Sequence, residues 1–87
     1  MKSVIEIAND LISSKNKIAI KDNIFYGSSF NERSNFSAQN EIGETLLQIG
    51  AEKLNGFQQD ICKRYFENKF QISEKQSWAI TFALINL

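Results

Sequence analysis

The chain has 87 residues, and its ten lysines and arginines balance ten aspartates and glutamates, so it carries no formal net charge. A neutral chain has no whole-molecule field that would draw it to nucleic acid or to an anionic lipid surface, so any such binding requires a local patch. The length fits a single domain. A hydrophobic fraction of 43% with 11% aromatic residues is enough for a globular core and argues against a disordered chain.

Neither a disulfide nor a membrane segment is expected. The only cysteine, Cys62, cannot form an internal disulfide, and the sequence does not open with the pattern of a secretory signal. No apolar run reaches the roughly 18 residues needed to span a bilayer. We therefore expect a cytoplasmic protein without a membrane partner.

The first predicted element is a helix over about residues 3 to 14. Ser3 and Glu6 have the spacing of a capping box, and apolar residues from Val4 to Ile12 recur at intervals of three and four. One face of this helix should dock on the core.

The hydrophobic pattern changes from helical to alternating over residues 17–27. Ile18 and Ile20 would share one face of a strand, and Asp22-Asn23 can occupy the positive-φ positions of a two-residue turn. The segment is therefore predicted to be a short β-hairpin that leans on the helices, since two strands alone are barely stable. An irregular extended loop would show the same residues.

The most polar and turn-rich part of the chain follows, and residues 27–36 are predicted to form a surface loop. This loop contains Phe30 and Phe36. They either anchor the loop on the core or serve as exposed recognition residues, since loops often carry function. The sequence does not choose between these two interpretations.

A second helix is predicted from Ser37 to about Asn55, with Ile42 and the apolar residues that follow it along one line. Gly43 and Gly50 lie seven residues apart and therefore on roughly the same face. Each costs about 1 kcal/mol relative to alanine in a helix interior. Either another backbone approaches closely at these positions, or the glycines simply weaken the helix.

A third helix is predicted to begin at Asn55, with Gln58 in the matching capping-box position, and to end with Asn68 in the left-handed conformation. Its apolar stripe should face the core. The members of this stripe are Phe57, Ile61, Cys62, Tyr65 and Phe66.

The last predicted helix begins at Ser73, which forms a capping box with Gln76. From Trp78 to Ile85 the apolar residues cover well over half of the circumference and leave little room for a polar stripe. Such a helix must be enclosed, either by the rest of this chain or by another chain. The predicted fold class is therefore mainly α, within α+β, with about four helices, a short hairpin between the first two, and a closing antiparallel helical pair.

The sequence contains few residues suited to catalysis. It contains no histidine, which is the commonest general base and metal ligand. Cys62 is expected to be a buried thiol with no imidazole to activate it. The four glycines are too dispersed to form a phosphate-binding loop. We therefore predict no enzyme activity, no metal and no cofactor.

One group of cationic and aromatic residues stands out around the predicted hairpin and loop. Cations beside exposed aromatic rings are what single-stranded nucleic-acid binders use to hold phosphates and stack bases. Lysine on an edge strand also serves simply to prevent edge-to-edge aggregation. The candidate binding residues are Lys15, Lys17, Lys21, Phe25, Tyr26, Phe30, Arg33 and Phe36.

The last third of the chain combines capping and core residues in one pattern, Phe57-x-x-x-Ile61-x-x-x-Tyr65 followed by Phe70-x-Ile72-Ser73-Glu74-Lys75-Gln76 and an apolar helix. This segment resembles one found at the ends of small phage, prophage and plasmid proteins. The resemblance implies an origin in a mobile element. It also implies a function typical of such proteins, either inhibition of a host defence or enzyme by binding, or assistance in DNA metabolism.

Three functional hypotheses follow. The leading one is a small non-enzymatic phage-type protein that binds a host protein and inhibits or modulates it, for example an anti-defence factor such as an anti-CRISPR. The second is a small nucleic-acid-binding module that uses the basic and aromatic hairpin. The third is a self-assembling structural protein, a homo-oligomer whose C-terminal helix is buried between subunits.

Overall fold

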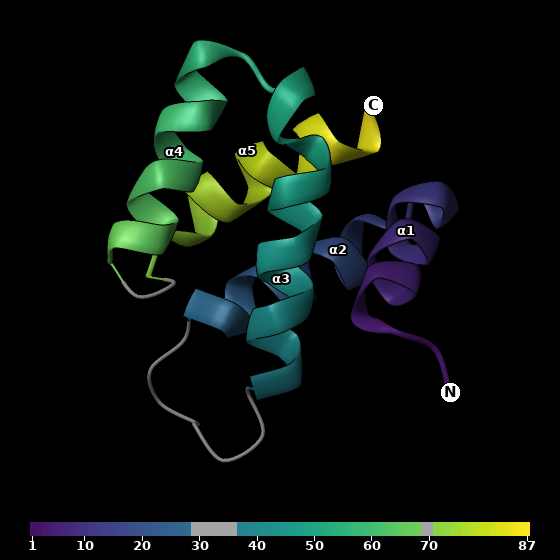
Figure 1. The fold of residues 1–87 in the computed structure, drawn as a ribbon. Helices are drawn as coiled ribbons and strands as arrows, with labels where there is room; N and C mark the ends of the chain where they lie inside the picture. The colour runs from purple at the N-terminus through teal and green to yellow at the C-terminus, as the bar shows by residue number, and fades with distance from the viewer. Residues whose placement is uncertain (29–36, 69–70) are drawn as a thin grey trace.

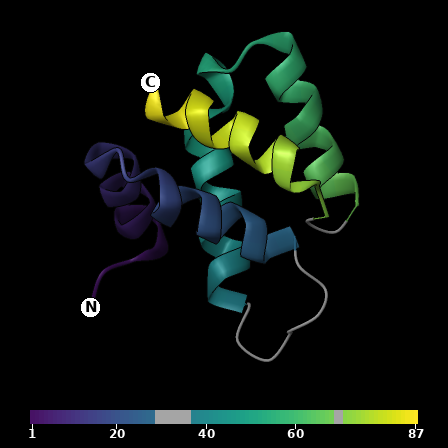
Figure 2. The ribbon, with the colours of Figure 1, turned by 180° about the vertical axis from the view of Figure 1, so that it is seen from behind.

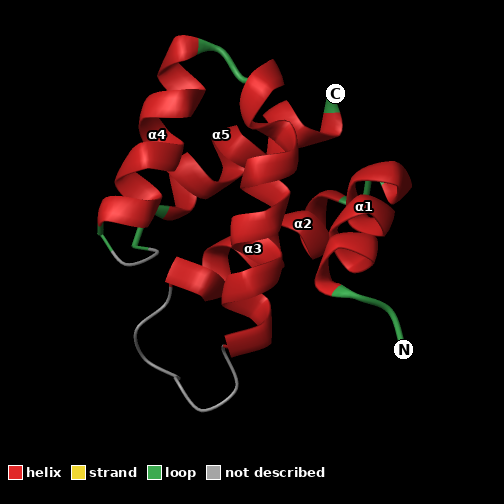
Figure 3. Cartoon of the chain, in the orientation of Figure 1, coloured by secondary structure: helices red, strands yellow, loops and turns green. Residues whose placement is uncertain are grey.

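The computed structural model describes residues 1–28, 37–68 and 71–87, and within these ranges the chain is entirely helical (Figure 3). The helices are α1 (Val4–Ser14), α2 (Lys17–Ser28), α3 (Ser37–Gly50), α4 (Gly56–Glu67) and α5 (Glu74–Ile85), with a single 3-10 turn, η1 (Ala51–Lys53). The predicted α+β class is therefore wrong, because no strand occurs in these ranges. None of the helices described is long and apolar enough to cross a membrane.

Helix α3 occupies the middle of the fold and contacts α1, α2 and α5 (Figure 1). Seen from behind, α2 and α5 lie side by side across α3 and run in opposite directions (Figure 2). Helix α4 packs against α5, which turns back obliquely from the end of α4. This arrangement leaves the outer sides of α2 and α5 facing solvent together.

The predicted β-hairpin is replaced by α2, and the reason lies in the spacing of its buried residues. Ile20 and Ile24 are one helical turn apart and both are fully buried, whereas Ile18 is 66% exposed. Asn16 starts the helix, because its side-chain oxygen accepts a hydrogen bond from the backbone N–H of Ala19 at 3.0 Å. The decisive spacing is therefore the four residues between the buried isoleucines rather than the two residues between Ile18 and Ile20.

The supposed turn residues of the hairpin also belong to this helix. The side-chain amide of Asn23 donates to the carbonyl of Ala19, one turn earlier, at 2.7 Å. A short polar side chain that satisfies itself on its own helix in this way removes the need for a turn at Asp22-Asn23.

The predicted starts of the last two helices are confirmed by their capping boxes. The side chain of Asn55 accepts from the N–H of Gln58 and the Gln58 side chain accepts from the N–H of Asn55, both at 2.9 Å. Ser73 and Gln76 exchange the same two bonds at 3.1 and 3.0 Å. These bonds satisfy donors that a helix would otherwise leave without partners.

One predicted helix end is wrong, and at another the residue is right but its predicted left-handed conformation is wrong. Helix α3 stops at Gly50, and η1 carries the chain on to Leu54. Asn68 ends α4 with a φ of −97°, outside the left-handed region. The left-handed residue is Lys15, which ends α1 with a φ of 57°.

The two glycines of α3 mark close helix contacts. A Cβ on Gly43 would lie 2.9 Å from the carbonyl oxygen of Asn23 in α2, and one on Gly50 would lie 2.4 Å from a methyl carbon of Leu84 in α5. Close approach is thus the reason for both glycines. The buried apolar residues that surround these contacts form one core: Ala8, Ile20, Ile24, Leu46, Leu47, Leu54, Ile61, Cys62, Tyr65, Ile80 and Leu84.

Helix α5 is enclosed on one side only. Its inward side consists of Ser77, Ile80, Thr81 and Leu84, all fully buried. Phe82, which was expected to be enclosed, is 45% exposed. The rest of this chain therefore encloses only the inward side of the tail helix, and Phe82 is left open, while enclosure by another chain stays a prediction.

The apolar stripe predicted for α4 is buried only in its middle. Ile61, Cys62 and Tyr65 belong to the core, but Phe57 is 69% exposed and Phe66 is 38% exposed. These two rings flank the buried residues on opposite sides of the helix, because they are nine residues apart.

Candidate functional site

Cationic, aromatic and apolar side chains gather along the seam between α2 and α5, and we call this region the α2–α5 surface. On α2 the residues Lys17, Lys21 and Phe25 follow one another at intervals of four, and so share one side of the helix. On α5 the residues Trp78 and Phe82 do the same. Because the helices run in opposite directions, Lys17 meets Phe82 and Lys21 meets Trp78. Ile18 is also exposed on α2, about 100° around the helix axis from Lys17.

Lys21 lies at the centre of the surface and is fully engaged. Its ammonium is 5.1 Å from the ring centroids of both Phe25 and Trp78, and 2.9 Å from a carboxylate oxygen of Glu74. The Lys21 side chain is only 15% exposed, so solvent screens these contacts weakly. Lys21 therefore joins α2 to α5 and its charge is already balanced.

Lys17 lies at the more open end of the surface. Its ammonium is 5.3 Å from the ring centroid of Phe82, and the Phe82 ring is in turn stacked with Trp78, with centroids 5.5 Å apart. Ile18, the next residue on α2, is 66% exposed. This end therefore presents the partly exposed Phe82 ring on α5, with the Lys17 ammonium over it, and exposed Ile18 on α2.

Lys15 makes contacts within the fold. Its ammonium donates to the backbone carbonyl of Ile85 and, at 3.3 Å, to that of Leu87. A cation suits this position because the C-terminal end of a helix carries partial negative charge and leaves carbonyls without helical partners. Lys15 thus holds the α1–α2 turn against the end of α5.

The structure brings together part of the predicted binding group. Lys17, Lys21 and Phe25 share the α2–α5 surface, and Tyr26 belongs to the last turns of α2. The remaining predicted residues, Phe30, Arg33 and Phe36, lie outside the described residues.

Sequence reasoning missed the α5 half of the surface. Trp78, Phe82 and Glu74 were assigned to an enclosed helix, although their spacing of four residues places them on a common side. That spacing of four residues was the available signal. Together with the same spacing in α2, it would have indicated two rows of side chains, one on each helix, that face each other.

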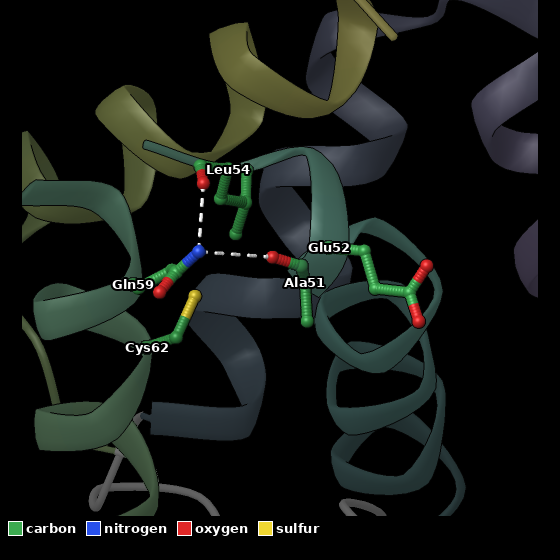
Figure 4. A pocket seen from close by; sticks show the side chains of 5 residues that line it. All are labelled: Ala51, Glu52, Leu54, Gln59 and Cys62. Atoms are coloured by element: carbon green, nitrogen blue, oxygen red, sulfur yellow. Dashed lines mark hydrogen bonds between the residues drawn. The ribbon is translucent and has the colours of Figure 1, made fainter. Parts of the chain in front are cut away.

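A shallow pocket of about 280 Å³ lies apart from this surface, where η1 meets α4 (Figure 4). Gln59 spans it, because its side-chain amide donates to the carbonyls of Leu54 at 2.8 Å and of Ala51 at 3.5 Å. Glu52 and Cys62 complete the lining. Burial raises the pKa of Cys62 to about 11, so the thiol remains protonated near neutral pH and is a poor nucleophile.

The part of the chain that the structure describes contains no group of three side chains suited to hold a metal ion. No family model matches the chain, and neither a curated protein nor a solved structure is found to be similar to it. The resemblance of residues 57–84 to phage, prophage and plasmid proteins stays a prediction. The geometry of the α2–α5 surface is the basis for the functional proposal.

Proposed function

We propose that this protein is a small non-enzymatic interaction module that binds a host protein through the α2–α5 surface and inhibits or modulates it. The observation that carries the proposal is the exposure of Ile18 (66%) on α2 and of Phe82 (45%) on α5, two helices that pack side by side, with the Phe82 ring stacked on Trp78. Apolar side chains grouped on a surface are typical of protein interaction sites. An aromatic centre with a charged margin is also the usual composition of the residues that dominate protein binding.

The contacts of the lysines favour a protein partner over nucleic acid. Lys21 is balanced by Glu74, and Lys15 is bonded to the carbonyls at the end of α5. The Phe82 ring has the Lys17 ammonium over it and is stacked with Trp78. Of the three lysines in the predicted binding group, only Lys17 has neither a hydrogen bond nor an ion pair with the described residues, whereas phosphate-driven binding sums over several cations.

The scaffold beneath the surface supports tight binding, because its parts are held in place before a partner arrives. Lys21 fixes the separation of α2 and α5 through two rings and one carboxylate. Ordering side chains on association costs roughly 0.5 to 1.5 kcal/mol for each flexible group, and a surface that is already ordered avoids much of that cost.

The host protein as target is suggested by the resemblance to phage, prophage and plasmid proteins. Small proteins of mobile elements commonly act by blocking a host factor, and inhibition of a defence system, as by an anti-CRISPR, is the particular form that we propose. Formal neutrality fits this mode, since binding through apolar contacts needs no long-range attraction.

The test uses three forms of the full chain in bacterial lysate: wild type, Ile18→Asp and Ile5→Asp. Ile5 is 61% exposed in α1, outside the α2–α5 surface, and is therefore a matched control for Ile18. We expect wild type and Ile5→Asp to retain the same host protein and Ile18→Asp to lose it. Titration of the purified target should then give saturable binding that Ile18→Asp weakens at least tenfold, together with inhibition of the target's activity by wild type.

Two outcomes would overturn the proposal. One is that no host protein is retained, or that Ile5→Asp and Ile18→Asp lose it equally. The other is binding of a short single-stranded DNA at low salt that weakens steeply as salt rises and disappears in Lys17→Gln, which would indicate the nucleic-acid function instead.

A further inference from the structure

We infer that the partner segment bound at the α2–α5 surface is acidic, with two carboxylates about 10 Å apart and an apolar side chain between them. The inference rests on the proposed function for the existence of a protein partner at this surface. It adds the chemistry of the part of that partner that makes contact.

The outward side of α5 carries a stripe of side chains. Lys75 and Phe82 are seven residues apart, so they lie within about 20° of each other around the helix axis and about 10 Å apart along it. Ala79 lies between them on the same side. Lys75 and Phe82 are exposed and Ala79 is half-buried, whereas Ile80 and Leu84, on the opposite side of α5, are fully buried. A partner that covers α5 must therefore contact this stripe.

Each end of the stripe has a lysine ammonium. Lys75 forms one end, and at the other end the Lys17 ammonium of α2 lies 5.3 Å from the centroid of the Phe82 ring. Neither lysine forms a hydrogen bond or an ion pair with another described residue. The apolar part of the stripe therefore has a cation at either end whose charge is not balanced by the described part of the fold.

The acidic residues of the same two helices do not cancel this positive charge. The charged side chains of α2 and α5 are Lys17, Lys21, Asp22, Glu74 and Lys75. Glu74 pairs with Lys21 at 2.9 Å. Asp22 lies about 140° around α2 from Lys17 and is turned away from α5. The stripe is therefore positively charged, and an acidic segment is complementary to it.

The spacing of the stripe describes the acidic segment further. In a helix, two carboxylates about 10 Å apart on one side are seven residues apart, and the residue four places after the first lies between them. An apolar side chain at this middle position can approach α5 at Ala79, because the methyl group of Ala79 extends less far from the helix than Lys75 or Phe82. An amphipathic helix of the partner, laid along α5, presents all three groups together.

The neighbourhood of Lys75 favours a carboxylate over a run of phosphates. Glu74 precedes Lys75, and its side chain is 62% exposed. A single acidic side chain can face Lys75 and avoid Glu74, whereas the closely spaced phosphates of a nucleic acid would be repelled by it. The acidic ligand is therefore a protein segment.

The test is a selection from a displayed library of random peptides, with the purified full chain as bait. Wild type should enrich peptides that carry Asp or Glu seven residues apart with an apolar residue between them. The double variant Lys17→Glu, Lys75→Glu should instead enrich peptides with Lys or Arg at those positions, because the charges at both ends of the stripe are reversed.

A peptide selected by wild type then measures the contribution of each lysine. Lys17→Glu and Lys75→Glu should each weaken its binding about fivefold or more, because an attraction between exposed charges becomes a repulsion. Lys53→Glu is the matched control, since Lys53 is exposed in η1 and also forms no ion pair with another described residue. It changes the net charge equally and should alter the affinity less than about twofold. Circular dichroism checks that each variant is folded.

Four results overturn the inference. The selection with wild type enriches no peptide, or it enriches peptides without acidic residues. The three single substitutions, at Lys17, Lys75 and Lys53, weaken the selected peptide equally. The fourth is binding of a short single-stranded DNA at low salt that Lys17→Glu or Lys75→Glu abolishes, which would indicate phosphate as the ligand.

These outcomes are separable from those of the proposed function. A host protein that is bound through Ile18, but that Lys17→Glu and Lys75→Glu bind as well as wild type does, overturns only the acidic partner segment. Selection of acidic peptides that depends on both lysines, with no host protein retained from lysate, overturns only the proposed function.

Discussion

Helix α2 is held on its two sides in different ways. Toward α3 and α4 the contacts are close and buried: Gly43 of α3 leaves no room for a side chain beside the Asn23 carbonyl, and the Tyr65 hydroxyl of α4 donates to the Ile24 carbonyl at 3.3 Å. Toward α5 the contact consists of lysine ammoniums over aromatic rings that solvent partly reaches. The closed side defines the fold, while the open side can receive a partner without disturbing the core.

The largest loss of stability should follow from adding a side chain on the closed side of α2. Gly43→Val places a Cβ 2.9 Å from a backbone oxygen and 3.0 Å from the Tyr65 hydroxyl, and neither neighbour can withdraw without shifting a helix. We expect the free energy of unfolding to fall by about 3 kcal/mol, measured by urea denaturation. Gly56→Val is the control, because nothing lies within 4 Å of its Cβ position, and it should change stability by less than about 0.5 kcal/mol. Equal effects of the two substitutions would contradict the close contact.

Because Cys62 and Tyr65 are buried, the protein should lose stability at alkaline pH. Burial raises the pKa of Cys62 from its ordinary 9.0 to about 11, and burial together with the Glu44 charge raises the pKa of Tyr65 as well. Both groups are neutral when protonated. Above about pH 9 the unfolded chain therefore releases a proton from Cys62 that the folded chain keeps.

The stability contributed by the raised pKa of Cys62 is thus fully present below pH 9 and is lost as pH rises toward 11. The loss from Cys62 alone should approach 2 to 3 kcal/mol, following about 1.4 kcal/mol for each pKa unit. Denaturation of wild type and Cys62→Ala between pH 8 and 11 measures it, since the alanine variant lacks this part of the pH dependence. Parallel curves for the two proteins would show that the thiol is not in a dry site.

On the open side, substituting each of the two lysines that contact aromatic rings should lower the free energy of unfolding by different amounts. Lys21→Met removes an ammonium that is 15% exposed and contacts two rings and a carboxylate, so we expect a loss of about 1 to 2 kcal/mol in the free energy of unfolding. Lys17→Met removes an exposed ammonium that contacts one ring and should cost about 0.5 kcal/mol. If both substitutions had the same effect, solvent would screen the whole seam evenly and Lys21 would not be the residue that joins the helices.

A further effect, of about the same size, concerns the end of α1. Lys15→Ala and Lys15→Gly both remove the ammonium from the carbonyls of Ile85 and Leu87, but only glycine adopts a φ of 57° without strain. The glycine variant should therefore be more stable than the alanine variant by about 1 kcal/mol. A glycine variant no more stable than the alanine variant would show that Lys15 carries no backbone strain.

The sequence grouped three residues that lie together in the structure, although it assigned them to the wrong kind of element. Lys17, Lys21 and Phe25 share a face in a strand, which repeats every two residues, and also in a helix, where a spacing of four is about one turn. Their grouping therefore did not depend on the choice. Ile18 and Ile20 share a face only in a strand, and it is there that the prediction failed.

The sequence alone determined where two helices begin, because capping depends only on residues close together in the chain. The starts of α4 and α5 follow from bonds between residues three apart, Asn55 with Gln58 and Ser73 with Gln76, which any surroundings would permit. Tertiary packing decided the identity of α2, because burying Ile20 and Ile24 against α3 outweighed a weak alternating pattern.

Packing also decided which side of α5 turns inward, since a helix that is apolar almost all round carries no preference of its own. The small residues Ser77 and Thr81 face the core, and the Thr81 hydroxyl bonds to the Ser77 carbonyl at 2.8 Å and so needs no other partner. The large rings of Trp78 and Phe82 are thereby left at the seam with α2, where the lysine ammoniums meet them.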